Sequence, residues 1–194
     1  MGSESIRAFV SVNLDETLCG ALGRVAADLK KTGADVKWVQ PDNLHFTLKF
    51  LGEMENDSIE EIAAALRQTK QKKFDIEIGG LGAIPDTRRP RVIFADVVSG
   101  ARELSALAEA VESALEPLGF EREARKFLPH LTLGRIKSQK GMEKLIQKMA
   151  MDKSSIFGKI SVVRFSLMKS DLRPAGPIYT EIAEIPLNNG GGND

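Results

Sequence analysis

The sequence predicts a mixed fold of helices and strands, arranged as two α/β half-units of similar build. Apolar residues alternate with period two in some segments and recur with a helical period in others. The phrase H-x-T-L occurs twice, at 45–48 and 130–133, and it contains the only two histidines of the 194-residue chain. A repeated phrase within a repeated order of segments indicates an internal duplication.

The first half of the chain alternates between strand-like and amphipathic helical segments. A helix is expected from about Asp15 to Lys31, because its leucines recur on one helical stripe. Asp57 is expected to cap a second helix, since Glu60 follows three residues later. The strands expected in this half are 7–13, 36–40, the first histidine phrase at 43–52, 74–84 and 91–98.

The second half repeats this order. A helix from about 101 to 116 is expected to stop at Pro117 and Gly119, which both disfavour its continuation. After the second phrase come a shorter helix around 142–149 and strands around 159–168 and 177–186.

A single displacement of 85 residues relates the two halves. It carries His45 onto His130, and it also carries the first strand, the first helix and the strand at 74–82 onto expected elements of the second half. We therefore predict one two-lobed domain over residues 1–187 with an internal repeat. The strand at 91–98 can correspond either to the first strand or to the last strand, 178–185, so the boundary between the halves stays open. The glycine-rich segment 188–194 is expected to be a disordered tail.

The composition limits the kinds of partner. Lys+Arg and Asp+Glu are balanced at 27 each, so an anionic ligand must be held by a local site rather than by a general positive field. Two histidines and one cysteine without metal-ligand spacing cannot form a standard zinc site. We expect no metal, no cofactor, no membrane association and a cytoplasmic location.

Strand alternation separates a chemical face from a packing face in each phrase. In the first phrase His45, Thr47 and Lys49 share one face, and Phe46, Leu48 and Phe50 share the other. In the second phrase His130 and Thr132 share a face. Strict alternation puts Arg135 on the opposite face, unless the strand ends or bulges near Gly134.

Two such strands facing each other would bring two imidazoles and two hydroxyls to one small group. A phosphodiester can be broken by one base and one acid, and imidazole exchanges protons near neutral pH. Threonine hydroxyls can hold the non-bridging oxygens. Either histidine alone is more often a packing residue, so the interpretation depends on the pair.

The segments "NLHFTLKFLG", "PHLTLGR" and "RAFVSV" resemble the 2H phosphoesterase superfamily, specifically its RNA 2′,3′-cyclic phosphodiesterase branch, formerly called 2′–5′ RNA ligase (LigT or ThpR). The likeness spans about residues 6–187. It implies a bilobal α+β fold with antiparallel sheets lining a central cleft and helices outside. It also implies metal-independent opening of a terminal cyclic phosphate to a 2′-phosphate, with reversible 2′–5′ ligation as a further expectation.

The resemblance also implies roles for individual residues. His45 would be the general acid and His130 the general base, although the repeated phrase itself does not distinguish them. Thr47 and Thr132 would bind the phosphate. The weaker candidates for substrate contact are Arg135, Phe9 and Lys49.

Three functions remain open at the level of sequence. The first is hydrolysis of RNA 2′,3′-cyclic phosphate ends by a monomer, with tRNA fragments among the candidate substrates. The second is hydrolysis of small cyclic nucleotides or 2′–5′ oligonucleotides. The third is a module that binds RNA ends without turnover, which two proton-exchanging histidines disfavour.

Overall fold

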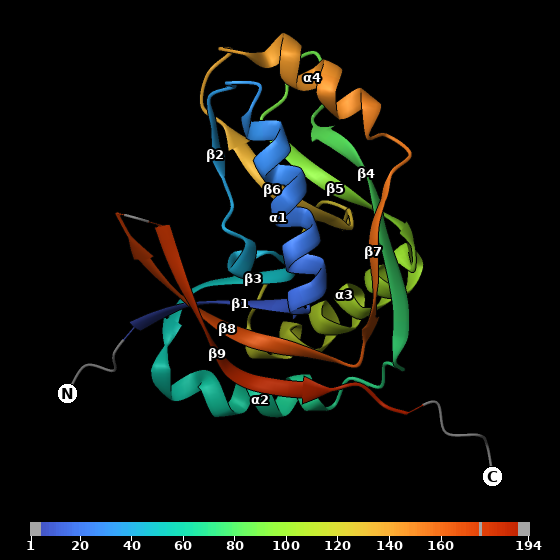
Figure 1. The fold of residues 1–194 in the computed structure, drawn as a ribbon. Helices are drawn as coiled ribbons and strands as arrows, with labels where there is room; N and C mark the ends of the chain where they lie inside the picture. Colours follow the sequence, from blue (N-terminus) through green and yellow to red (C-terminus); the bar gives the residue numbers. More distant parts are fainter. Residues whose placement is uncertain (1–4, 175, 190–194) are drawn as a thin grey trace.

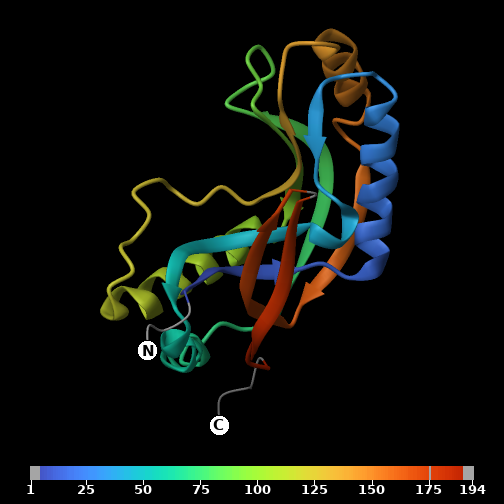
Figure 2. The same cartoon turned by 90° about the vertical axis from the view of Figure 1, so that its left-hand side faces the viewer.

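The computed structural model describes residues 5–174 and 176–189, and its strands form two antiparallel sheets with helices outside them (Figures 1 and 2). The predicted α+β fold with antiparallel sheets is confirmed. In chain order, the elements are β1 (Ser5–Asn13), α1 (Glu16–Lys30), β2 (Val36–Trp38), η1 (Pro41–Asn43), β3 (His45–Glu55), η2 (Asn56–Ser58), α2 (Ile59–Arg67), β4 (Phe74–Ile84), β5 (Val92–Ser99), α3 (Ala101–Leu115), η3 (Glu116–Leu118), β6 (His130–Ile136), α4 (Met142–Met151), β7 (Ile156–Val162), β8 (Arg164–Arg173) and β9 (Gly176–Pro186).

The two sheets exchange strands between the halves of the sequence. Sheet A has the order β3-β1-β8-β9, and sheet B has the order β2-β6-β5-β4-β7. Thus β4 of the first half lies in sheet B, whereas β8 and β9 of the second half complete sheet A. Each lobe therefore needs both halves of the chain.

The helices are exchanged in the same way. Helix α1 follows a strand of sheet A but packs on β7 of sheet B, and α3 follows a strand of sheet B but packs on β3 of sheet A. Helix α2 joins α3 beside sheet A, and α4 joins α1 beside sheet B. This interleaving places helices on the outer faces of both sheets, and the region where β3 and β6 approach each other is the expected cleft.

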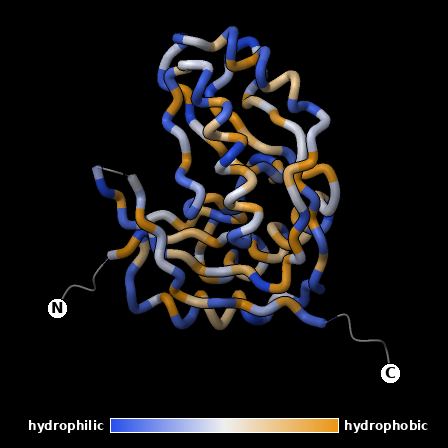
Figure 3. Tube along the Cα trace, in the orientation of Figure 1, coloured by the Kyte–Doolittle hydropathy of each residue, from blue (hydrophilic) through white to orange (hydrophobic). Residues whose placement is uncertain are grey.

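Apolar side chains of the strands and helices form one connected core. Figure 3 shows hydrophobic stretches along the inner strands, while hydrophilic residues dominate the outer turns. Leu18, Leu22 and Leu29, expected on one stripe of the first helix, are all buried. The side chain of Asp15 accepts a hydrogen bond of 2.8 Å from the Leu18 backbone N–H and so caps α1.

Two expectations about element boundaries are wrong. Asp57 does not cap α2, because it lies within η2 and Ser58 occupies the N-cap position. The single strand expected around 159–168 is two strands, β7 and β8, separated at Val163. The chain passes there from sheet B to sheet A, so one continuous strand could not serve both sheets. The predicted internal repeat stays a prediction.

The expected tail begins later than its composition indicates. Asn188 forms a bridge with Lys72, and its backbone N–H donates to the Gln71 carbonyl at 2.9 Å. Asn188 is therefore anchored, which corrects that part of the expectation, and residues 190–194 lie outside the described residues. Within residues 5–174 and 176–189, no helix is both long and apolar enough to cross a membrane.

Candidate active site

The two histidines open the two strands at which the sheets approach each other. His45 is the first residue of β3, the edge strand of sheet A, and His130 is the first residue of β6 in sheet B. Strands β3 and β6 contact each other directly. Both imidazoles are partly exposed, so the prediction that the fold brings the two phrases together is supported by the arrangement of these strands.

Each imidazole is held by the same local hydrogen bond. Nδ1 of His45 lies 2.8 Å from the carbonyl oxygen of Asn43, and Nδ1 of His130 lies 2.7 Å from that of Leu128. Because a carbonyl only accepts, Nδ1 must carry the proton in both rings. Nε2 is therefore the nitrogen left for chemistry, as an acceptor in the neutral ring and a donor in the cation.

A β-bulge interrupts the alternation of the first phrase. Thr47 pairs with Ser11 and Lys49 pairs with Val10, so Leu48 is an extra residue without a partner on β1. Lys49 and Phe50 therefore lie on the faces opposite to those that strict alternation predicts, and a second unpaired residue, Leu51, restores the original alternation beyond it.

The second phrase contains an equivalent bulge. Thr132 pairs with Phe94 and Gly134 pairs with Ile93, which leaves Leu133 as the extra residue on β6. The fourth residue of each H-x-T-L phrase is thus the bulged residue.

The bulge at Leu48 overturns the expectation for Lys49. Its side chain does not share the histidine face but turns toward α3, where it is 3% exposed and paired with Glu112. Lys49 therefore cannot reach a phosphate in the cleft. Phe50, which was expected on the packing face, instead lies on the histidine face with 61% of its surface exposed.

The bulge at Leu133 brings Arg135 to the histidine face. Arg135 pairs with Val92, two residues from Phe94, and so points to the same side as Thr132. Burial raises the pKa of Tyr179 in sheet A, and the positive charges of Arg135 and Arg7 oppose that shift. Of the two alternatives for Arg135, the bulged strand is correct.

The rings of Phe9 and Tyr179 lie close to the imidazole of His45. The ring centroid of Phe9 lies 4.9 Å from that of His45, and the ring of Tyr179 stands perpendicular to His45 at 5.2 Å. Phe9 is only 3% exposed, so it supports the imidazole but offers almost no surface to a sugar or base. The expectation that Phe9 contacts the substrate is therefore corrected.

Polar side chains of β1 and β8 lie next to the histidine strand β3. Ser11 and Ser166 are buried, and Asn13 hydrogen-bonds both hydroxyls, at 3.0 Å and 3.3 Å. Ser166 in turn donates to Glu181 at 2.6 Å. Thr47 lies opposite Ser11 on this surface, and Thr132 occupies the equivalent place in sheet B.

Burial lowers the pKa of His45 below its ordinary value of 6.5. The hydrogen bond to the Asn43 carbonyl acts in the opposite direction and offsets only part of the effect. In the free protein His45 is therefore neutral at pH 7, with a lone pair on Nε2.

Three residues at the cleft were missed by sequence reasoning. Phe50 was misassigned because alternation gives no sign of a bulge, and Phe94, whose ring lies 5.6 Å from that of His130, looked like an ordinary strand residue. Tyr179 carried one available signal, since it is the only tyrosine in the chain.

Among the residues that the structure describes, no three His, Cys, Asp or Glu side chains are grouped as ligands for one metal ion. Metal independence and the absence of a cofactor stay predictions, which an assay with chelator can test.

Comparisons with known proteins agree with this architecture. The chain is 37% identical over 184 residues to an RNA 2′,3′-cyclic phosphodiesterase of Methanothermobacter thermautotrophicus, covering 94% of this chain and 99% of the relative. It is 34% identical to an RNA 2′,3′-cyclic phosphodiesterase of Aeropyrum pernix, and the match covers 90% of this chain and 99% of that relative. A crystal structure of a protein from Thermus thermophilus superposes with a TM-score of 0.78 at 28% identity, covering 96% of this chain and 100% of the other.

The fold of Escherichia coli LigT in its apo form is also similar, with a TM-score of 0.77 at 23% identity over 96% of this chain and all of the other. The model of the LigT like phosphoesterase family matches residues 12–94 and 96–179, one stretch around each histidine phrase. The chain therefore belongs to the LigT like phosphoesterase family.

Proposed function

We propose that the protein hydrolyses RNA ends that carry a 2′,3′-cyclic phosphate and leaves a 2′-phosphate. One observation carries the proposal: two histidines open adjacent strands, and each has Nδ1 occupied by a carbonyl two residues earlier and Nε2 left for a ligand. The relatives that cover nearly the whole chain and are named RNA 2′,3′-cyclic phosphodiesterases support this substrate class.

The reaction needs one proton acceptor and one proton donor. In the proposed direction, Nε2 of neutral His130 takes a proton from water, and the water oxygen attacks phosphorus. The bond from phosphorus to O3′ breaks, and Nε2–H of cationic His45 gives its proton to O3′. The 2′-oxygen keeps the phosphate. This assignment of acid and base follows the family resemblance.

To act as the general acid, His45 must carry a proton on both ring nitrogens when the substrate is bound. Burial lowers the pKa of His45, so the free protein presents it mainly in the neutral form near pH 7. A bound phosphate anion would favour the imidazolium, because an opposite charge at close range raises the pKa of a histidine. On this proposal, substrate binding itself protonates the acid.

The remaining cleft residues would bind the substrate. Thr47 and Thr132 can donate hydroxyl hydrogen bonds to the non-bridging oxygens, and Arg135 can neutralise their charge. The exposed ring of Phe50, on the same face as His45, is suited to stacking against the terminal base. Monomeric assembly, a cytoplasmic location, tRNA fragments as substrates and reverse 2′–5′ ligation belong to the proposal as well.

The central test is a product assay. The purified protein, with a chelator such as EDTA present, is expected to convert a short RNA ending in 2′,3′-cyclic phosphate into RNA ending in 2′-phosphate. Unchanged RNA, with or without added metal, would contradict the proposal, and a 3′-phosphate product would contradict the direction of opening. Parallel reactions with small cyclic nucleotides and 2′–5′ oligonucleotides identify the alternative substrates, and binding without product identifies a binding module.

Replacement of either histidine should remove most of the activity. His45→Ala and His130→Ala are each expected to lower kcat by about 10²–10⁴-fold, because each deletes one proton transfer. Thermal melting should show that both variants fold, since both rings are partly exposed at the cleft. Lys144→Ala on the outer helix α4 is the surface control. Near-normal turnover by either histidine variant would rule out the two-histidine mechanism.

The titration of His45 can be followed by NMR, because only two histidines contribute imidazole signals. In the free protein, the His45 signal is expected to titrate below pH 6.5, since burial disfavours its cation. Addition of a nucleoside 2′-phosphate should move that midpoint upward, because the anion favours the cation. A midpoint at or above 6.5 in the free protein, or no upward movement with saturating ligand, would refute the proposed protonation on binding.

Phe50→Ala should weaken substrate binding. Loss of one base-stacking contact costs about 1–3 kcal/mol, so KM for the RNA is expected to rise roughly 5- to 150-fold with a smaller change in kcat. Phe50→Tyr keeps the ring and should keep KM. Equal KM values for the alanine variant and the unmodified protein would exclude Phe50 from the base site.

A further inference from the structure

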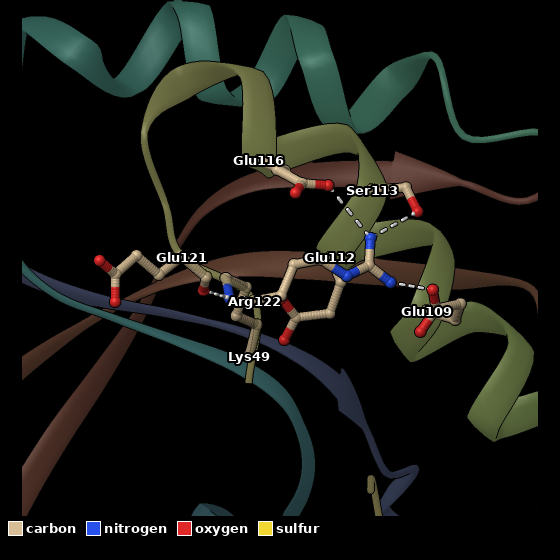
Figure 4. Close-up of polar contacts among 7 residues, drawn as sticks. All are labelled: Lys49, Glu109, Glu112, Ser113, Glu116, Glu121 and Arg122. Carbon is tan, nitrogen blue, oxygen red and sulfur yellow. Dashed lines mark hydrogen bonds and ion pairs between the residues drawn. The ribbon is translucent and has the colours of Figure 1, made fainter. Parts of the chain in front are cut away.

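Lys49 lies four residues after His45 on the opposite side of sheet A from the cleft, and its side chain is almost completely buried. Nζ donates to Oε2 of Glu112 on α3 at 2.6 Å and to the backbone carbonyl of Glu121 at 2.7 Å (Figure 4). An ammonium removed from water requires such partners, since an unpaired buried charge is strongly unfavourable. The Lys49 side chain therefore has one defined position.

The second of these bonds reaches a different part of the site. Glu121 belongs to the irregular segment 119–129, which connects η3 to β6 and extends away from both sheets before it returns to His130 (Figure 2). The last part of this segment includes Leu128, whose carbonyl oxygen holds Nδ1 of His130. The conformation of the segment thus affects the orientation of the His130 ring.

The rings of Phe120 and Phe127, at the two ends of the exposed part of this segment, pack against the core. Residues 121–126 are exposed, and a cavity of about 410 Å³ lies beside them, lined among others by Leu48, Glu112 and Arg122. Arg122 does pair with Glu109 and Glu116 on α3 (Figure 4). These pairs are largely exposed to solvent, where ion pairs contribute little. The partly buried bond from the Lys49 ammonium to the Glu121 carbonyl ties this exposed stretch to β3.

We infer that Lys49 is a positioning residue that couples the two histidines: from the strand of His45, it anchors the segment that orients His130. This inference adds a role to the hydrolysis proposed above and rests on it for the catalytic consequence. A purely structural role would instead depend on the ion pair with Glu112, which joins β3 to α3 and includes no residue of the segment. The two bonds of Lys49 can be separated by substitution.

Three variants separate them. Lys49→Met removes both bonds and leaves Glu112 buried without its partner. Glu112→Gln removes the carboxylate charge but keeps Lys49 bound to the Glu121 carbonyl. The double variant Lys49→Met/Glu112→Leu removes both bonds without leaving a buried charge, and replacements of this kind often restore stability.

The kcat values of these variants test whether Lys49 affects catalysis. Lys49→Met and the double variant are expected to lower kcat by roughly 10- to 100-fold with little change in KM, as expected for a small misplacement of a catalytic group. Glu112→Gln should keep kcat near that of the unmodified protein even if its Tm falls. If the double variant melts like the unmodified protein and also keeps its kcat, the inference is wrong.

A second measurement requires no substrate. Ring ¹⁵N chemical shifts in NMR report which imidazole nitrogen carries the proton. The His130 signals should lose the pattern of a fixed Nδ1–H in both Lys49 variants and keep it in Glu112→Gln. His45, which is held by Asn43 of η1, is the internal reference. Unchanged His130 signals in both Lys49 variants would overturn the inference even if the RNA is hydrolysed. Altered signals in a protein that does not hydrolyse cyclic phosphate would refute only the proposed function.

Discussion

The extra residue that directly follows each H-x-T triplet determines which side chains share the histidine face. The bulges at Leu48 and Leu133 reverse the alternation after each H-x-T triplet. Residues before a bulge and residues beyond it then reach the same surface from one strand. Without the bulges Lys49 would face the cleft, and both Phe50 and Arg135 would be turned toward the outer helices. The composition of the site therefore depends on backbone pairing as much as on the motif.

The exchange of strands between the sheets connects the two histidine strands through the main chain. Sheet A is completed by β8 and β9, and sheet B is completed by β4, so neither lobe can form from one half of the sequence. Helix α3 connects the lobes further, because it follows β5 of sheet B, packs on β3 of sheet A and carries Glu112. The relative placement of the two histidines is thus built into the main-chain topology rather than left to a flexible interface.

Much of this arrangement could be predicted from the sequence, and the features that could not be predicted share a physical cause. Local periodicity sufficed for most helices and strands, and for the shared face of His45 and Thr47, because those relations depend on a few neighbouring residues. A bulge depends on the register with a partner strand, which the local pattern does not contain. The placement of Lys49, Phe50 and Arg135 could not follow from alternation alone. Tyr179 reaches His45 from β9, far along the chain, so only the folded sheet shows their contact.

The two phrases are alike, yet the fold gives their histidines different surroundings. His45 lies beside the rings of Phe9 and Tyr179, whereas within the described part of the chain His130 packs against the ring of Phe94 alone. The apolar enclosure of His45 disfavours its cation and lowers its pKa, although the hydrogen bond at Nδ1 is equivalent in both phrases. A duplicated motif supplies two chemically equal groups, and a reaction with one acid and one base needs them to be unequal. The aromatic rings of sheet A distinguish His45 but favour its neutral form, so its proposed role as acid depends on a bound phosphate that raises its pKa.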